Sequence, residues 1–292
     1  MTANDSGPAP PPQGAPMRGG RSVSPPQALP AGDAAWTPRL RDRLNLVWTL
    51  LWRSFLPRNR RESFQLVWVF AEPVGQLAVM ILLFSLIGRT AGYGDSFALF
   101  LLTGIAMLTL FTRGAGLVSS AITGLGGTTR LAGVGMFHEA IAKALFETLI
   151  TAVILAALAY AIGAFEGRDT WPHHFEHVAA ALFWGGLLGF GFGLLRGYAV
   201  QEMPLLERIY VILSRVLIFV SGVFFVPSFM PDPYRSWLAW NPVVHVVELL
   251  RLGVYDQYPT LVYDADYLRG FALGSTALGM AALWRRRALF MG

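Results

Sequence analysis

The stretch FALFLLTGIAMLTLFTRGAGLVS, residues 97–119, decides the fold of this chain. A helix needs about 20 mostly apolar residues to cross the hydrocarbon core of a bilayer. This stretch has that length and carries one charged side chain, Arg113. Because so long an apolar helix cannot be covered by a small soluble core, the stretch predicts a helix that spans a membrane.

Five more stretches have the same character, and the composition of the whole chain agrees with them. Charged residues make up 14% of the 292 residues, against roughly 25% in soluble domains. Hydrophobic residues make up 54%, and the mean hydropathy is +0.49. The sequence therefore predicts an all-α membrane protein with six spans, at residues 64–87, 97–119, 140–163, 178–200, 209–226 and 268–284.

The chain divides into a tail and one membrane domain. Residues 1–37 are rich in proline and glycine and contain no apolar run, which predicts a disordered cytoplasmic tail. A proline-rich ligand for another protein is the alternative for this tail. Residues 38–292 would then form the transmembrane domain. There is no cysteine, which excludes disulfides and thiolate chemistry.

An amphipathic segment precedes the first span. In residues 40–56 leucines recur at helical spacing, while arginines and two tryptophans occupy the other faces. This pattern favours a helix lying in the membrane surface, although a soluble amphipathic helix would share it. The basic cluster Arg58, Arg60 and Arg61 that follows favours the membrane, because such clusters lie beside anionic headgroups.

The basic residues also predict the orientation. Arginine supplies all but one of the 23 basic residues, and Lys143 is the only lysine. Near the span ends, ten basic residues fall on one side and five on the other. The richer side should be cytoplasmic, which places both termini inside.

Two further features concern helix packing and the outer side. Four glycines at i, i+4 spacing predict a smooth ridge for close helix packing: Gly185, Gly189, Gly193 and Gly197. The long outside loop 227–267 is rich in proline, tryptophan and tyrosine. Because irregular backbone cannot face lipid, we expect short re-entrant helices in this loop.

Charged residues inside the spans are the first candidates for function. Arg113, Arg196 and Arg215 lie inside predicted spans, toward the cytoplasmic side. With Arg58, Arg60 and Arg61 they would form a basic collar suited to a phosphate group, or each would simply snorkel to the interface. Glu72, which precedes Pro73, would pair with one of these arginines; proton coupling is the alternative.

Other patterns suggest less. His173, Glu176 and His177 match a zinc-binding spacing, H-x-x-E-H, but the short-loop context favours a polar interfacial cap, so no metal is predicted. No nucleophile has a nearby base, so no enzymatic site is predicted. The only lysine follows no glycine-rich loop, which excludes a P-loop for ATP. Any ATP-driven motor must then be another polypeptide.

The cytoplasmic segment 124–138 is a candidate for contact with such a motor. It is short and mildly amphipathic, and it would either dock as a helix into a groove on the motor or form a plain loop. The candidate ATPase-coupling residues are Arg130, Leu131, Val134, Phe137 and His138.

Four short stretches carry a resemblance to a known family. They are AEP at 71–73, ALFETLI at 144–150, the run 224–231 and WNPVVHVVELLR at 240–251, and they occur in this order in capsular polysaccharide ABC exporter permeases of the KpsM type, which this chain resembles over about residues 40–285. The tail is long for that family, and Ser54 and Gln65 depart from its pattern. The resemblance adds candidate substrate-binding residues to those above: Trp68, Trp240, His245, Glu248 and Arg251.

The resemblance implies a permease that works as a homodimer with two ATP-binding cassette subunits. ATP and magnesium would be bound by those subunits, so no cofactor is expected on this chain. It also implies a Gram-negative inner membrane, a lipid-linked acidic polysaccharide as cargo, and handover to a periplasmic copolymerase and an outer-membrane exporter. Membrane lipid is an expected partner of the chain, and nucleic acid is not.

Other transport functions remain open at this point. An exporter of O-antigen, of a teichoic-type glycan or of a small molecule would share the same spans. An ion-coupled secondary transporter centred on Glu72, or a membrane enzyme acting on a lipid-linked glycan, represents a different class.

Overall fold

All regular structure in the described part of the chain is helical, as the sequence predicts. The computed structural model describes residues 45, 47–51, 60–86, 88, 92–124 and 136–291, with the backbone alone in 60–70 and 286–291. The elements are α2 (Arg60–Leu86), α3 (Phe97–Ile122), α4 (Met136–Glu166), α5 (Phe175–Glu202), α6 (Leu205–Val220), η1 (Pro227–Phe229), α7 (Tyr234–Leu238), α8 (Pro242–Val254) and α9 (Ala265–Met291).

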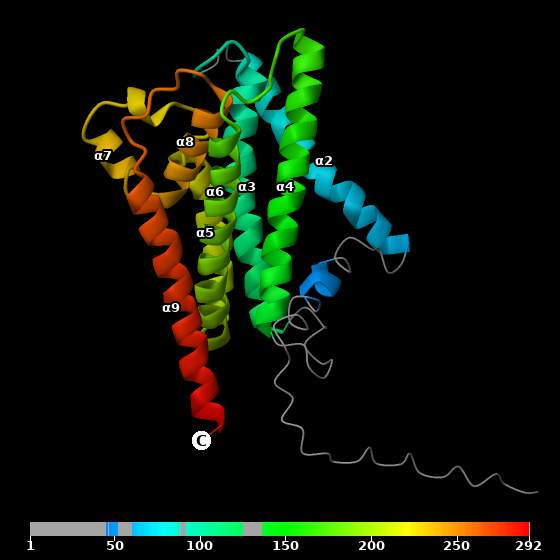
Figure 1. The fold of residues 1–292 in the computed structure, drawn as a ribbon, viewed down its shortest axis with the longest axis vertical. Coiled ribbons are helices and arrows are strands. Elements are labelled where there is room, and N and C mark those ends of the chain that lie inside the picture. The colour runs from blue at the N-terminus through cyan, green and yellow to red at the C-terminus, as the bar shows by residue number, and fades with distance from the viewer. Residues whose placement is uncertain are drawn as a thin grey trace, which may run out of the picture. The chain divides into compact units, whose positions relative to one another are not determined.

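Helix α5 occupies the centre of the bundle. It packs along α3 on one side and along α9 on another, and α4 lies against α3 (Figure 1). The predicted glycine ridge makes this packing possible. A Cβ atom on Gly193 would lie 2.9 Å from the backbone oxygen of Ala115, and one on Gly197 would lie 2.7 Å from Cβ of Ile122. The ridge therefore brings the backbones of α5 and α3 together, as predicted.

Two helix starts show how the sequence defines these elements. The hydroxyl of Ser96 accepts the N–H of Leu99 at 3.1 Å and so caps α3. The side chain of Asn241 accepts the N–H of Val243 at 3.0 Å, and Pro242 follows at the first position of α8. We call the end of the bundle that carries α7 the α7 end; the other end carries the C-terminus (Figure 1).

Three helices of the described residues are long and apolar enough to cross a membrane: α3, α4 and α5. Helix α2 contains a shorter apolar part, Ala71–Leu86. The predicted total of six spans is therefore reached only in part, and the spans at 209–226 and 268–284 stay predictions. Helix α6 ends at Val220, before the predicted end at 226, because Ser221 and Gly222 (φ 71°) turn the chain toward η1.

The predicted loop 227–267 does contain short helices: η1, α7 and α8. Helix α8 packs against α5 and α3, and its residues are almost all buried. Near the N-terminus, residues 45 and 47–51 are helical. The rest of the predicted surface helix 40–56 and the predicted tail 1–37 lie outside the described residues.

Candidate functional site

Arg113 on α3 forms the centre of a charged cluster that joins three helices. Its Nη1 lies 3.1 Å from Oε2 of Glu72 on α2, and its Nε lies 3.3 Å from Oε1 of Glu147 on α4. The Glu147 side chain is 2% exposed, whereas that of Glu72 is 53% exposed. Arg113 therefore has one buried partner, Glu147, and one partner that reaches the surface, Glu72. The predicted pairing of Glu72 with an intramembrane arginine is confirmed.

This cluster borders a cavity of about 410 Å³ between α2, α3 and α6. Its walls are polar, because several neutral hydrogen-bonding side chains accompany the charges. The polar lining residues are Glu72, Gln76, Thr109, Thr112, Arg113, Ser214 and Arg215. We call this space the charged cavity.

Arg215 on α6 supplies the second positive charge of the charged cavity. Its side chain is exposed, and within the described residues no carboxylate lies within 4.0 Å of it. Arg113 is held by two carboxylates, whereas among the described residues Arg215 has no such partner. A guanidinium with five N–H donors binds phosphate and carboxylate groups well, so the charged cavity can hold an anionic group.

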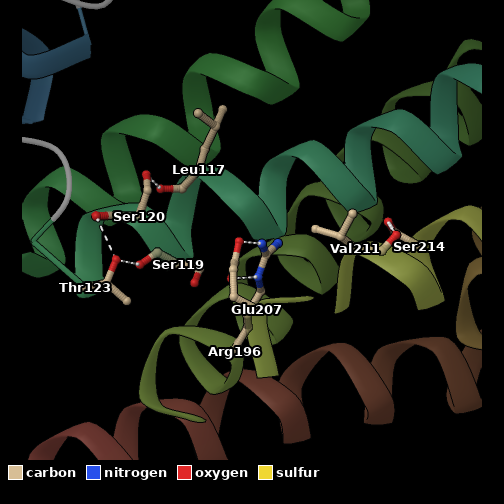
Figure 2. Close-up of polar contacts among 8 residues, drawn as sticks. All are labelled: Leu117, Ser119, Ser120, Thr123, Arg196, Glu207, Val211 and Ser214. Atoms are coloured by element: carbon tan, nitrogen blue, oxygen red, sulfur yellow. Dashed lines mark hydrogen bonds and ion pairs between the residues drawn. The ribbon is translucent and has the colours of Figure 1, made fainter. Parts of the chain in front are cut away.

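The third predicted arginine is used differently. Arg196 on α5 binds both carboxylate oxygens of Glu207 near the start of α6, with Nε at 3.2 Å from Oε2 (Figure 2). Its guanidinium also lies over the ring of Tyr210, 3.8 Å from the ring centre. Arg196 thereby ties α5 to α6, and it lines a separate, mostly apolar cavity of about 490 Å³. The structure does not bring it into the charged cavity.

Arg251, from the conspicuous run 240–251, is completely buried. Its Nη2 donates to the carbonyls of Val223 at 3.1 Å and Phe100 at 3.4 Å, and its Nη1 donates to the carbonyl of Phe225 at 3.3 Å. Its Nε donates to the hydroxyl of Thr103 at 3.2 Å. The side chain thus satisfies backbone groups from two distant parts of the chain and stabilises the turn after α6.

The other polar residues of this run also point inward. Tyr258 donates to Oε1 of Glu248 at 2.7 Å, and burial raises the pKa of the Glu248 carboxyl to about 7 although this hydrogen bond and the nearby Arg251 lower it. Both ring nitrogens of His245 are engaged: Nδ1 accepts the N–H of Asp264, and Nε2 donates to the carbonyl of Ala239.

None of the buried polar residues His245, Glu248 and Arg251 lines the charged cavity. Their predicted contact with substrate has no support in this geometry and stays a prediction. Trp240 at the start of the run is 78% exposed and remains available for contact with a sugar ring. The run therefore combines an enclosed polar core with one exposed aromatic side chain.

Several predicted residues lie where the structure describes little. Arg58 is outside the described residues, and the side chains of Arg60, Arg61 and Trp68 are likewise not described. The predicted collar of six arginines therefore cannot be assembled from the described atoms. Of its described members, Arg113 and Arg215 share a cavity and Arg196 lines another.

The candidate coupling segment is described at its end only. Arg130, Leu131 and Val134 lie outside the described residues, whereas Phe137 and His138 form the first turn of α4. Phe137 packs against a small apolar cluster that includes Val118 and Ile122 of α3 and Leu283 of α9. The described end of this segment is thus packed against the helical bundle, and its coupling role stays a prediction.

Sequence reasoning did not single out Glu147 or Gln76. Glu147 stands alone as a carboxylate within an apolar stretch of α4, and that isolation was the available signal. Gln76 lies one helical turn after Glu72 on the same face of α2, which places both at the charged cavity.

Comparison with known proteins gives the family. The family model described as "ABC-2 type transporter" matches residues 45–255, which is most of the chain. The chain belongs to the ABC-2 type transporter family. The resemblance inferred from the sequence motifs is therefore confirmed at the level of the family.

Among individual ABC-2 relatives, the polysialic acid transport protein KpsM of Escherichia coli is 30% identical over 79% of this chain and 89% of its own length. The capsule polysaccharide export inner-membrane protein BexB of Haemophilus influenzae is 23% identical over 79% of this chain and 87% of its own length. The capsule polysaccharide export inner-membrane protein CtrC of Neisseria meningitidis is 22% identical over 82% of this chain and 90% of its own length.

Proposed function

We propose that this chain is the membrane permease of an ATP-driven exporter that moves a lipid-linked acidic capsular polysaccharide across the inner membrane. Membership of the ABC-2 type transporter family supports the transport role, and the names of its relatives support the cargo. The observation on this chain that carries the proposal is the charged cavity, in which Arg215 is exposed and has no carboxylate partner among the described residues. The chain itself performs no covalent chemistry.

The proposed topology has six crossings with both termini in the cytoplasm. Helices α2, α6 and α9 would be the other three crossings, in addition to the three clearly apolar helices α3, α4 and α5. The sixteen residues of α6 rise only about 24 Å, less than the ~30 Å hydrocarbon core, so the turn after Val220 would lie within the outer leaflet. The bundle end that carries the C-terminus would face the cytoplasm, because Lys143, Arg208 and Arg285 lie near it.

The proposed working unit contains two copies of this chain. No residue of α6 is buried, and its apolar side chains Ile212, Leu213 and Phe219 are each more than half exposed. A second copy facing α2 and α6 would enclose the charged cavity and form a path between the copies. Two ATP-binding subunits, a periplasmic copolymerase and an outer-membrane exporter would complete the assembly.

The mechanism follows from the charges. The anionic lipid-linked end enters at the inner leaflet near Arg58–Arg61 and meets Arg215 and Arg113 in the charged cavity. Because Glu72 and Glu147 already neutralise Arg113, the anion is held weakly enough to move on. ATP binding by the partner subunits moves segment 124–138 and opens the path. Exposed aromatic residues such as Trp240 then guide the sugar chain at the exit.

Charge reversal at Arg215 tests this proposal in cells. In a strain that lacks its own capsule permease and carries the cognate ATP-binding subunit, the Arg215→Glu variant should abolish surface polysaccharide at normal permease levels. Arg215→Lys should retain part of the export, because it keeps the charge. Arg269→Glu on α9, also exposed, makes the same charge change away from the charged cavity and should leave export intact.

Two results would contradict the proposal. Wild-type export by Arg215→Glu would remove the anion-binding role of the charged cavity. Purification of the intact permease without a stoichiometric P-loop ATPase, from cells that contain the subunit, would argue against an ATP-driven exporter and for a secondary transporter or an enzyme.

A further inference from the structure

Three side chains at the start of α5 form a compact cluster that the transport function does not use. They are His174, Glu176 and His177, at the α7 end of the bundle. Oε1 of Glu176 lies 3.5 Å from Nδ1 of His174 and 3.6 Å from Nδ1 of His177. The ligand atoms of all three residues lie within 4.8 Å of one another.

These distances match those between the ligands of a bound metal ion. Zinc binds imidazole nitrogen and carboxylate oxygen at 2.0–2.2 Å, so in tetrahedral geometry its ligand atoms lie about 3.4 Å apart. The two distances from Glu176 come close to this value. Two imidazoles and one carboxylate leave a fourth position open to water.

A second observation concerns one ring nitrogen of this cluster. Nδ1 of His177 is shielded from solvent, and it has no hydrogen-bond partner among the described residues. A buried polar atom without a partner is rare in proteins, and a bound water or ion commonly satisfies such an atom. This nitrogen faces the carboxylate of Glu176 at a distance slightly too long for a hydrogen bond.

The surroundings of His174 resemble the outer shell of a metal site. Its Nε2 lies 4.0 Å from Oδ1 of Asp256, which follows α8. Its backbone N–H donates to the carbonyl of Gly253 at 3.0 Å, which holds the ring beside that loop. Metal-binding histidines commonly place a carboxylate at the second ring nitrogen, where it orients the ring and raises its basicity.

We propose that His174, Glu176 and His177 bind a divalent transition-metal ion, with Zn²⁺ as the best match to the ligand set. Asp256 is the positioning residue for His174. The ion would hold the first turn of α5 together, and Asp256 would link His174 to the segment after α8. The sequence spacing H-x-x-E-H pointed to His173 as the first ligand, whereas the structure assigns this place to His174. The inference does not depend on the proposed export function.

The test is a metal titration of the full-length permease in detergent, purified through a tag without histidine and stripped with a chelator. Wild-type protein should bind one Zn²⁺ per chain in competition with a chromophoric chelator. Co²⁺ should give the intense visible absorption of a tetrahedral site. His174→Ala, His177→Ala and Glu176→Gln should each remove this binding, and Asp256→Asn should weaken it about tenfold or more.

His173→Ala is the matched control, since it removes an exposed neighbouring imidazole and should bind Zn²⁺ as the wild type does. The proposal is overturned if the wild type takes up no stoichiometric Zn²⁺ or if His174→Ala binds it as well as the wild type. It is also overturned if His173→Ala loses the ion. The elution volume in size-exclusion chromatography verifies that each variant is folded.

Discussion

Replacing Arg113 by glutamine should destabilise the permease, and a second replacement should undo most of the loss. Arg113 stands between Glu147, whose side chain is 2% exposed, and Glu72, whose side chain is 53% exposed. The Arg113→Gln substitution leaves the Glu147 carboxylate buried without its positive partner. Changing Glu147 to glutamine as well removes that charge.

The geometry sets the expected size of this effect. Removing one partner of a fully buried ion pair costs about 3–5 kcal/mol. Arg113 is 26% exposed, so solvent screening lowers the expected loss to about 2–3 kcal/mol. In a domain of this size each kcal/mol shifts the unfolding temperature by about 2–4 °C, which predicts a drop of about 4–12 °C. The Glu72→Gln change should cost less than about 1 kcal/mol, since exposed pairs contribute little.

The assay is thermal unfolding of the purified permease in one detergent, followed through tryptophan fluorescence. The order of unfolding temperatures should be wild type close to Glu72→Gln, then the double variant Arg113→Gln/Glu147→Gln, then Arg113→Gln alone. Equal unfolding temperatures for the double variant and Arg113→Gln would refute the reasoning, because the buried Glu147 charge would then play no part in the loss.

Three further predictions concern other parts of the chain. Gly193→Ala should lower stability by about 1–3 kcal/mol, because its Cβ would lie 2.9 Å from a carbonyl oxygen of α3. Gly274→Ala should leave stability unchanged, because open space surrounds that position. Thermal unfolding of the two variants compares these effects. Arg251→Lys should cost about 3 kcal/mol or more, because buried carbonyls lose their donors, and should show as aggregation in size-exclusion chromatography. Charge reversal of the N-terminal basic cluster should block export in cells and leave permease levels unchanged; that cluster is Arg58, Arg60 and Arg61.

The local parts of the fold could be predicted from the sequence. The all-helical class, the three long apolar helices and the glycine ridge depend on runs of apolar residues and on i, i+4 spacing, which are visible along the chain. The end of α6 was missed because apolar residues continue after Val220, although the Ser221–Gly222 pair marks a turn.

The site was predictable only in part, because it depends on contacts between distant residues. Glu72 and Arg113 are 41 positions apart, and the sequence could suggest their pairing only because charges inside a membrane need partners. The role of Arg251 could not be read in this way. Its acceptors are backbone carbonyls of Phe100, Val223 and Phe225, which are available to the guanidinium only once α3 and α8 have packed together.

Transport by purified components tests the central claim most directly. The permease and its cognate ATP-binding subunit are reconstituted into proteoliposomes with lipid-linked acidic polysaccharide, and the polysaccharide that becomes accessible on the far side is measured. Transport should occur with ATP and should be absent when the ATP-binding subunit cannot hydrolyse ATP. Equal transport by the permease alone, or driven by a proton gradient without ATP, would contradict the account.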